Sequence, residues 1–151
     1  MQKFGIGQPL KRKEDVRLLT GAGKYLDDLS FVGQAHAKFL RSPHAHARVT
    51  NVDTEKAKKS PGIIGVYCAE DILDAGLRPL PVSFMPENAQ PGYMPAFPLL
   101  AGSKVRYVGE AIAMVVADSE AQAVLACELI QVTYAPLPSS VELTKAAREG
   151  A

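Results

Sequence analysis

The chain has 151 residues, which is enough for one compact domain with a single core. Its 17 lysines and arginines balance 16 aspartates and glutamates, so no overall field attracts nucleic acid or an anionic membrane, and we expect neither as a partner. An apolar share of 47% with 22% charged residues is typical of globular chains and excludes disorder as the dominant state.

The N-terminal basic residues are not followed by the apolar segment of a secretion signal. No run approaches the roughly 18 apolar residues of a membrane span. We therefore expect a cytoplasmic protein without such a span. Residues 1–33 mix glycine, proline and charge and are expected to form an arm, with a short helix from Glu14 to Thr20 that Gly21 ends.

The main domain is expected at residues 34–142, followed by a C-terminal tail at 143–151. Its first half alternates short apolar runs with glycine and proline stops. The pattern predicts strands at 35–40 and 47–52, a helical turn at 54–60, a strand at 63–68 and a helix at 71–75 that Gly76 ends. The β-branched run of 63–68 suits burial on both faces of a sheet.

A proline-rich loop is predicted from residue 76 to residue 101, because six of the 11 prolines fall there. A loop of this length inside a compact domain is usually functional or held by a neighbour. Its aromatic and methionine side chains need cover, so we expect a partner to contact them. These candidate interface residues are Phe84, Met85, Tyr93, Met94 and Phe97.

After the loop, strands are expected at 104–108 and 111–117, joined by a tight turn at Gly109 and Glu110. The second strand, AIAMVVA, has no polar residue and should be central. Ser119 and Gln122 form a capping box that predicts a helix to about Leu129. Its expected apolar side is made of Ala121, Val124, Leu125 and Cys127. A strand at 130–134 and a terminal helix at 142–148 follow, and the order over 111–134 resembles a split β-α-β unit in an α+β fold.

The segment RSPHAHARV, from Arg41 to Val49, holds the densest group of side chains capable of chemistry. His44 and His46 alternate and would share one face of an extended chain, where His36 could add a third zinc ligand. No carboxylate or cysteine lies at the usual ligand spacing, so hydrogen-bonded structural histidines are favoured. We expect no zinc at these residues.

Other candidates are weaker. The possible nucleophiles are Ser42, Ser60 and Cys68, and none lies in an elbow motif such as G-x-S-x-G. Acid or base roles stay open for Asp27, Asp28 and Glu110, although a cap-forming turn is favoured for the two aspartates. LTGAGK, from Leu19, lacks the spacing of a phosphate loop or dinucleotide fingerprint and predicts a glycine turn. Cys68 and Cys127 are expected as buried free thiols.

Four blocks, in order, resemble one family: KRKEDVRLLTGAGKYLDD from Lys11, RSPHAHARV from Arg41, VDTEKAKKSPGIIGV from Val52 and VRYVGEAIAMVVADS from Val105. The family is that of the large, molybdenum-binding subunits of xanthine dehydrogenase, aldehyde oxidase and aerobic carbon monoxide dehydrogenase. The chain is similar to their N-terminal a/b hammerhead domain over nearly its whole length. Ala111 departs from the family, where many members carry proline.

The resemblance implies a single a/b hammerhead domain, with a mixed sheet and a few helices, in which RSPHAHARV is architecture between strands. It also implies that the molybdopterin, the 2Fe-2S clusters and the FAD of the assembly lie on other domains and subunits. We therefore assign no catalytic, cofactor-binding or metal residue to this chain and expect it to be inactive alone. Its expected partners are the cofactor-binding remainder of the large subunit and the iron-sulfur and FAD subunits.

Three interpretations stay open for the chain itself. It is a separately encoded piece of a molybdenum hydroxylase, a truncated product, or a stand-alone binding module that reuses the fold. Self-association through the loop at 76–101 is compatible with all three. A small hydrolase or transferase built around His44, His46 and Asp27 or Asp28 is the alternative from another class.

Overall fold

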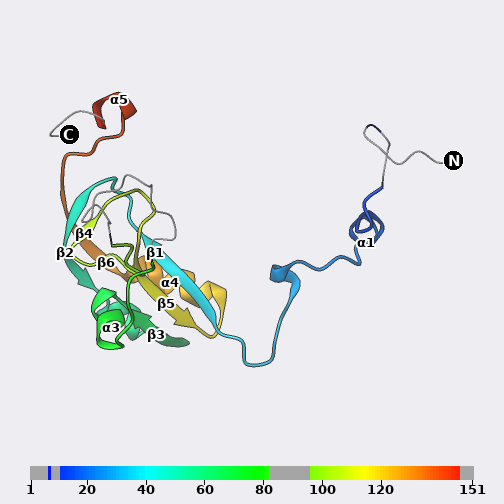
Figure 1. Cartoon of the computed structure of the whole chain (residues 1–151). Coiled ribbons are helices and arrows are strands. Elements are labelled where there is room, and N and C mark those ends of the chain that lie inside the picture. Colours follow the sequence, from blue (N-terminus) through cyan, green and yellow to red (C-terminus); the bar gives the residue numbers. More distant parts are fainter. Residues whose placement is uncertain (1–6, 8–10, 82–95, 147–151) are drawn as a thin grey trace. The chain divides into compact units, whose positions relative to one another are not determined.

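The computed structural model describes residues 7, 11–81 and 96–146, and the chain divides into two compact units, Met1–Gln34 and Ala35–Ala151 (Figure 1). The first unit holds two short helices, α1 (Asp15–Leu19) and the 3-10 helix η1 (Leu26–Asp28). None of the residues in these two helices is buried, so the helices form no core of their own.

Helix α1 ends where the sequence predicts. Gly21 has a φ of 73°, its N–H donates to the carbonyl of Leu18, and the N–H of Ala22 donates to the carbonyl of Arg17. This pair of hydrogen bonds is a Schellman motif, and it requires the left-handed conformation that glycine adopts without strain.

The described part of the second unit forms two antiparallel sheets of three strands each. The first sheet has the order β1-β5-β3, made of His36–Arg41, Ala111–Ala117 and Ile63–Tyr67. The second has the order β4-β2-β6, made of Lys104–Val105, Ala47–Asp53 and Gln131–Pro136. The combination of helices with antiparallel sheets confirms the predicted α+β class.

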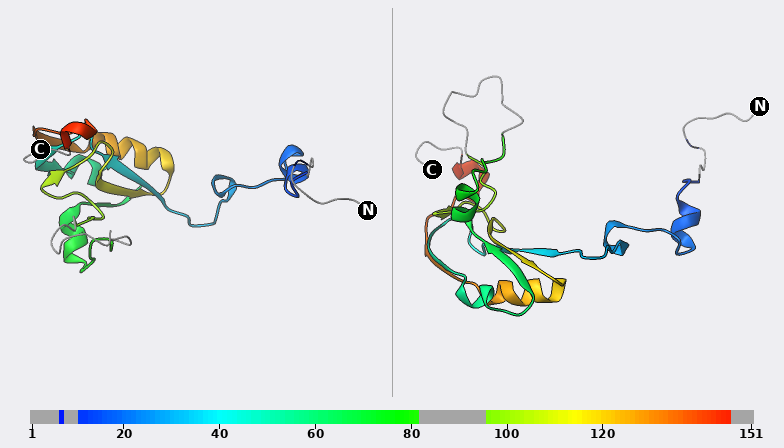
Figure 2. Two further views of the ribbon diagram at one scale, coloured as in Figure 1. Left: turned by 45° about the horizontal axis from the view of Figure 1, so that its top comes forward. Right: turned by 90° about the horizontal axis from the view of Figure 1, so that it is seen from below.

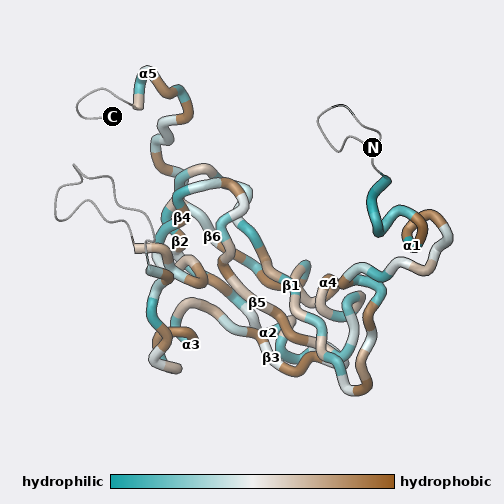
Figure 3. Tube along the Cα trace, turned by 45° about the vertical axis from the view of Figure 1, so that its right-hand side comes forward, coloured by the Kyte–Doolittle hydropathy of each residue, from teal (hydrophilic) through white to brown (hydrophobic). Residues whose placement is uncertain are grey.

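Strand β5 is the central strand of its sheet, as its apolar sequence predicts. Figure 3 shows this stretch as a hydrophobic part of the chain. Its antiparallel neighbours pair with it along almost its whole length, from His36 opposite Ala117 to Arg41 opposite Ala111 on one side. Both edges of β5 are therefore hydrogen-bonded, which is compatible with the lack of any polar side chain.

In the described residues of this unit, four α-helices accompany the sheets, namely α2 (Glu55–Lys58), α3 (Ala69–Asp74), α4 (Glu120–Leu129) and α5 (Leu143–Ala146). The predicted cap of α4 is confirmed, because Ser119 Oγ accepts a hydrogen bond from the Gln122 N–H at 3.4 Å. In the described residues, no helix combines the length and hydropathy that crossing a bilayer requires.

Helix α4 packs on β1, β5 and β3, and α2 lies beside it (Figure 2). Small buried side chains of α4, Ala123, Ala126 and Cys127, meet Ala113 and Val115 of β5. A second buried cluster contains Ala47, Ala101, Val105 and Ile112. Val52 and Val132 pack against both clusters, so the two sheets share one continuous core.

Two predicted connections are wrong. Residues 104–108 and 111–117 do not form a hairpin, because β4 contains only Lys104–Val105 and pairs with β2. The split β-α-β interpretation of 111–134 fails for the same reason, since β5 and β6 belong to different sheets. The turn at Gly109 and Glu110 moves the chain from one sheet to the other.

Two predicted burial patterns are also wrong. Strand β3 lies at the edge of its sheet, and Ile64 is 57% exposed, so the strand is not buried on both faces. Leu125, expected on the apolar side of α4, is 61% exposed, and the buried side is built from Ala123, Ala126 and Cys127. Small side chains let the helix approach the sheet closely. A prediction that looks for large apolar residues at helical spacing misses a buried side made of alanines.

Candidate functional site

The RSPHAHARV segment carries the chain from β1 of one sheet to β2 of the other. Ser42, at its start, is buried, and its Oγ both accepts from the His44 N–H at 3.0 Å and donates to the His44 carbonyl at 3.1 Å. The hydroxyl of this candidate nucleophile is thus occupied by the backbone two residues away. Such a bond holds a tight turn, which is a structural role.

The turn before β5 is bonded to this segment. The Ser42 N–H donates to the carbonyl of Glu110 at 2.9 Å, and the Gly109 N–H donates to the carbonyl of Ser42 at 2.8 Å. The guanidinium of Arg41 donates to the carbonyl of Gly109 at 2.8 Å. Gly109 has a φ of 90°, a conformation that favours glycine. Two distant stretches of sequence therefore form one junction between the sheets.

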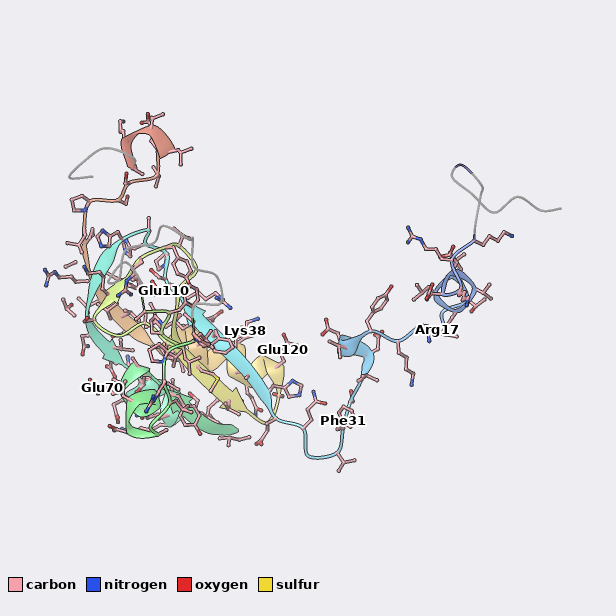
Figure 4. The ribbon with its side chains drawn as sticks, viewed as in Figure 1. Arg17, Phe31, Lys38, Glu70, Glu110 and Glu120 are labelled. Atoms are coloured by element: carbon pink, nitrogen blue, oxygen red, sulfur yellow. The ribbon has the colours of Figure 1, made fainter. Side chains whose placement is uncertain are left out.

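Glu110, labelled in Figure 4, is the buried charge of this junction. Only 4% of its surface is exposed. Its carboxylate accepts a hydrogen bond from the backbone N–H of Arg106 and pairs with the Arg106 guanidinium at 3.6 Å. A buried carboxylate with both partners in place is costly to disturb. The sequence predicts a tight turn at Gly109 and Glu110 and leaves an acid or base role open for Glu110. In the structure, the Glu110 carboxylate helps to hold the turn that leads into β5.

The two histidines of the segment face different partners. The His44 ring lies 4.6 Å from the ring of Tyr134. His46 Nδ1 lies 2.6 Å from the carbonyl of Pro138, and because a carbonyl only accepts, the proton is on Nδ1. His36 lies at the far end of β1, about 17 Å along the strand from Arg41, so it does not join them.

Burial raises the pKa of Tyr134. Across the described ranges, 11–81 and 96–146, no three side chains from histidine, cysteine, aspartate or glutamate gather as a metal site. His44 and Tyr134 belong to a packed junction, in which the raised pKa keeps the Tyr134 phenol protonated.

An open pocket of about 450 Å³ lies beside the junction. Its lining includes Ala45, His46, Arg106, Tyr107, Ser139 and Val141. The lining is mostly apolar, and the guanidinium of Arg106 is already paired with Glu110.

The remaining candidates serve local structure. The Asp28 carboxylate accepts from the Tyr25 N–H at 2.9 Å, which is the cap-forming turn expected for these aspartates. Ser60 Oγ donates to the carbonyl of Lys56 at 3.0 Å. Cys68 and Cys127 are free thiols; Cys127 is buried as predicted, whereas Cys68 is only half-buried, and desolvation raises the pKa of both. None of these groups is activated as a nucleophile by its surroundings.

Of the predicted interface residues, Phe84, Met85, Tyr93 and Met94 lie outside the described residues. Phe97 lies inside them, is 51% exposed and pairs with Leu80, whose N–H donates to its carbonyl at 2.9 Å. A bridge thus joins two described positions of the proline-rich loop, and both carry exposed apolar side chains.

Residues 20–138 match the family described as aldehyde oxidase and xanthine dehydrogenase, a/b hammerhead domain. The nicotine 6-hydroxylase large subunit of Paenarthrobacter nicotinovorans is 46% identical over 83% of this chain and 15% of its own length. The carbon monoxide dehydrogenase large chain of Afipia carboxidovorans is 42% identical over 94% of this chain and 16% of its own.

A solved structure of a Cu,Mo-CO dehydrogenase matches with a TM-score of 0.80 and 37% identity, over 97% of this chain and 17% of that one. The chain therefore spans about one sixth of the length of these relatives. Sequence and structure agree, and the resemblance drawn from the four sequence blocks is confirmed. The chain belongs to the a/b hammerhead domain family of aldehyde oxidase and xanthine dehydrogenase.

Proposed function

We propose that the chain serves as a structural, interface-forming hammerhead domain of a molybdenum hydroxylase large subunit and has no catalytic activity alone. One observation carries the proposal: the match covers 94% of this chain but 16% of the carbon monoxide dehydrogenase large chain. In this proposal, a domain that makes up one sixth of an oxidoreductase subunit supports the other five sixths of the polypeptide and does not carry out catalysis of its own.

The junction supports this proposal. The Ser42 hydroxyl and the Glu110 carboxylate are engaged in fixing the connection between the two sheets, and His46 Nδ1 is bonded to the carbonyl of Pro138, just after β6. Groups used in this way position the backbone and are not available to a substrate. As part of the proposal, residues 34–142 are the hammerhead domain, 1–33 its arm and 143–151 its tail, in a cytoplasmic assembly.

The thiols of this chain do not fit an iron-sulfur cluster. Such a cluster takes four ligands, usually cysteine thiolates, and the chain has two cysteines. Cys68 precedes α3, whereas Cys127 lies in α4 against the first sheet. Burial raises the pKa of both thiols, which disfavours the thiolate that binds metal. We therefore place the iron-sulfur clusters, the molybdopterin and the FAD on other parts of the assembly.

The proposed partners are the cofactor-binding remainder of the large subunit, with iron-sulfur and FAD subunits attached to it. The exposed Phe97 and Leu80 support a contact at the proline-rich loop, residues 76–101, because apolar side chains of this size are normally covered. Self-association through the same loop is the competing use of this surface.

The test is affinity purification of the tagged chain from its own organism at native expression level. Co-purifying polypeptides are identified, and molybdenum and iron are quantified per chain. We expect larger partner chains with near-stoichiometric amounts of both metals. A chain that emerges alone and free of metal contradicts the proposal and favours a stand-alone binding module.

A further inference from the structure

One face of the first sheet carries a row of large apolar side chains. Phe39 of β1 lies opposite Met114 of β5, which lies opposite Tyr67 of β3. In the next row, Ala37 lies opposite Val116, which lies opposite Gly65. Because side chains alternate along a strand, both rows share one face of the sheet.

Helix α4 covers the opposite face. Val115 of β5 and its partner Val66 of β3 are both buried in the cluster that α4 closes. Phe39, Met114 and Tyr67 are each adjacent in sequence to a residue whose side chain faces α4. Their own side chains therefore point to the opposite face of the sheet. Phe39 is 41% exposed and Tyr67 is 38% exposed, while Met114 and Val116 are half-buried.

The row of Phe39, Met114 and Tyr67 presents a flat surface. A Cβ on Gly65 would lie only 2.6 Å from the Tyr67 hydroxyl oxygen, so the tyrosine ring lies across the glycine and against the sheet. At the other edge, the guanidinium of Arg41 lies 5.7 Å from the ring centroid of Phe39. A flat apolar strip with a cation at its rim matches the composition of the centre of a protein interface.

The strip continues from the core of the molecule. Ile112 follows the same alternation as Met114 and Val116 and is fully buried in the second cluster. The apolar face therefore starts beneath the second sheet and extends outward over the first. Because the row is apolar from the core to the surface, its exposed part resembles a core layer that further polypeptide would cover.

We infer that the strip of Phe39, Met114, Tyr67 and Val116 is the surface on which the remainder of the large subunit packs. The inference rests on the proposed function. The relatives carry about five sixths of their length outside the region that matches this chain, which supplies the polypeptide for such a layer. The contacting segment is apolar, with an acidic or carbonyl group opposite Arg41.

The same affinity purification tests the inference with a double variant, Phe39→Ser with Tyr67→Ser. Its matched control is Leu73→Ser with Leu125→Ser, two exposed leucines on α3 and α4. We expect at least a tenfold loss of partner polypeptide and molybdenum per chain for the strip variant and less than a twofold change for the control. Thermal unfolding of both variants checks that the fold is kept.

The outcomes separate the two proposals. If wild type captures partner polypeptide and the strip variant captures as much, the strip is not the docking surface and the proposed function stands. If wild type captures none, the proposed function fails and the inference fails with it. A dimer of wild type that the strip variant abolishes makes a second copy the occupant and overturns the inference.

A measurement on wild type covers the case in which the strip variant does not fold. Hydroxyl-radical oxidation of Met114 is compared between the free chain and the purified assembly. We expect at least fivefold protection of Met114 in the assembly. Equal oxidation in both samples overturns the inference.

Discussion

At the residue scale, several polar side chains of this protein have a structural role. Glu110 lies 68 residues after Ser42 and 69 after Arg41, yet bonds across the junction connect the two backbone segments. Among the described residues, no buried side-chain nitrogen or oxygen is left without a partner. Full satisfaction makes each of these groups costly to remove, because its partner would lose its bond in a buried place.

Replacing Glu110 by alanine tests this role. The substitution removes the acceptor of the Arg106 N–H and the partner of its guanidinium, so we expect a loss of about 2–3 kcal/mol in the free energy of unfolding. Urea denaturation measures it. Glu55→Ala, which removes an exposed ion pair with Lys59, is the control and should leave the midpoint unchanged. Equal midpoints for the two variants would show that Glu110 does not hold the turn.

The raised pKa values of the two thiols make the stability of the folded chain depend on pH. Burial raises the pKa of Cys127 and of Cys68 above the ordinary value near 9, so the folded state keeps its thiol protons more tightly than the unfolded state. The resulting stability is present below the ordinary pKa and is lost as the pH rises through and above it. Iodoacetamide should alkylate the folded chain at pH 8 at least tenfold more slowly than the chain in urea. Equal rates would contradict the burial of Cys127 and the partial burial of Cys68.

At the element scale, glycines and caps set where helices stop. Gly76 repeats the arrangement of Gly21: its φ is 71°, its N–H donates to the Leu73 carbonyl, and the Leu77 N–H donates to the Ile72 carbonyl. These hydrogen bonds lie within a few residues of each other in the sequence. Local chemistry of this kind is visible before any fold is known, which is why both stops were predicted correctly.

Replacing Gly76 by alanine should therefore destabilise the chain by about 1–2 kcal/mol, because alanine is strained at positive φ. Thermal unfolding measures the change. Gly102→Ala is the control: an added Cβ there meets Ala69 at an ordinary 3.6 Å. The prediction fails if both alanine variants unfold at the same temperature.

At the scale of the whole molecule, two small sheets share one core and leave apolar surface on the outside. The expectation that Phe84, Met85, Tyr93, Met94 and Phe97 form an interface stays a prediction, and the exposure of Phe97 supports it. The sheet strip and the proline-rich loop are the two candidate surfaces. Together they describe a domain whose surface suits burial in a larger assembly.

Replacing Phe84, Tyr93 and Phe97 by serine tests the loop. Loss of three aromatic anchors should weaken partner binding at least tenfold, about 1.4 kcal/mol or more, while the unfolding temperature stays near that of wild type. Quantified co-purification with the partner chains measures the binding. A single Leu125→Ser variant is the control, and a partner affinity unchanged within error for the triple variant rejects the loop as a contact.

The sequence by itself determined the family, the α+β class, the central position of β5 and the ends of several helices. Each depends on residues close together in the chain or on motifs read in order, such as RSPHAHARV. Only the tertiary structure decided that β4 and β5 enter different sheets, that β3 is an edge strand and that α4 buries its alanines. These outcomes depend on hydrogen bonds and packing between segments far apart in sequence, which the local spacing of apolar residues does not encode. The burial of Glu110 is of this second kind, because the Ser42 segment that packs over its turn lies 68 residues earlier.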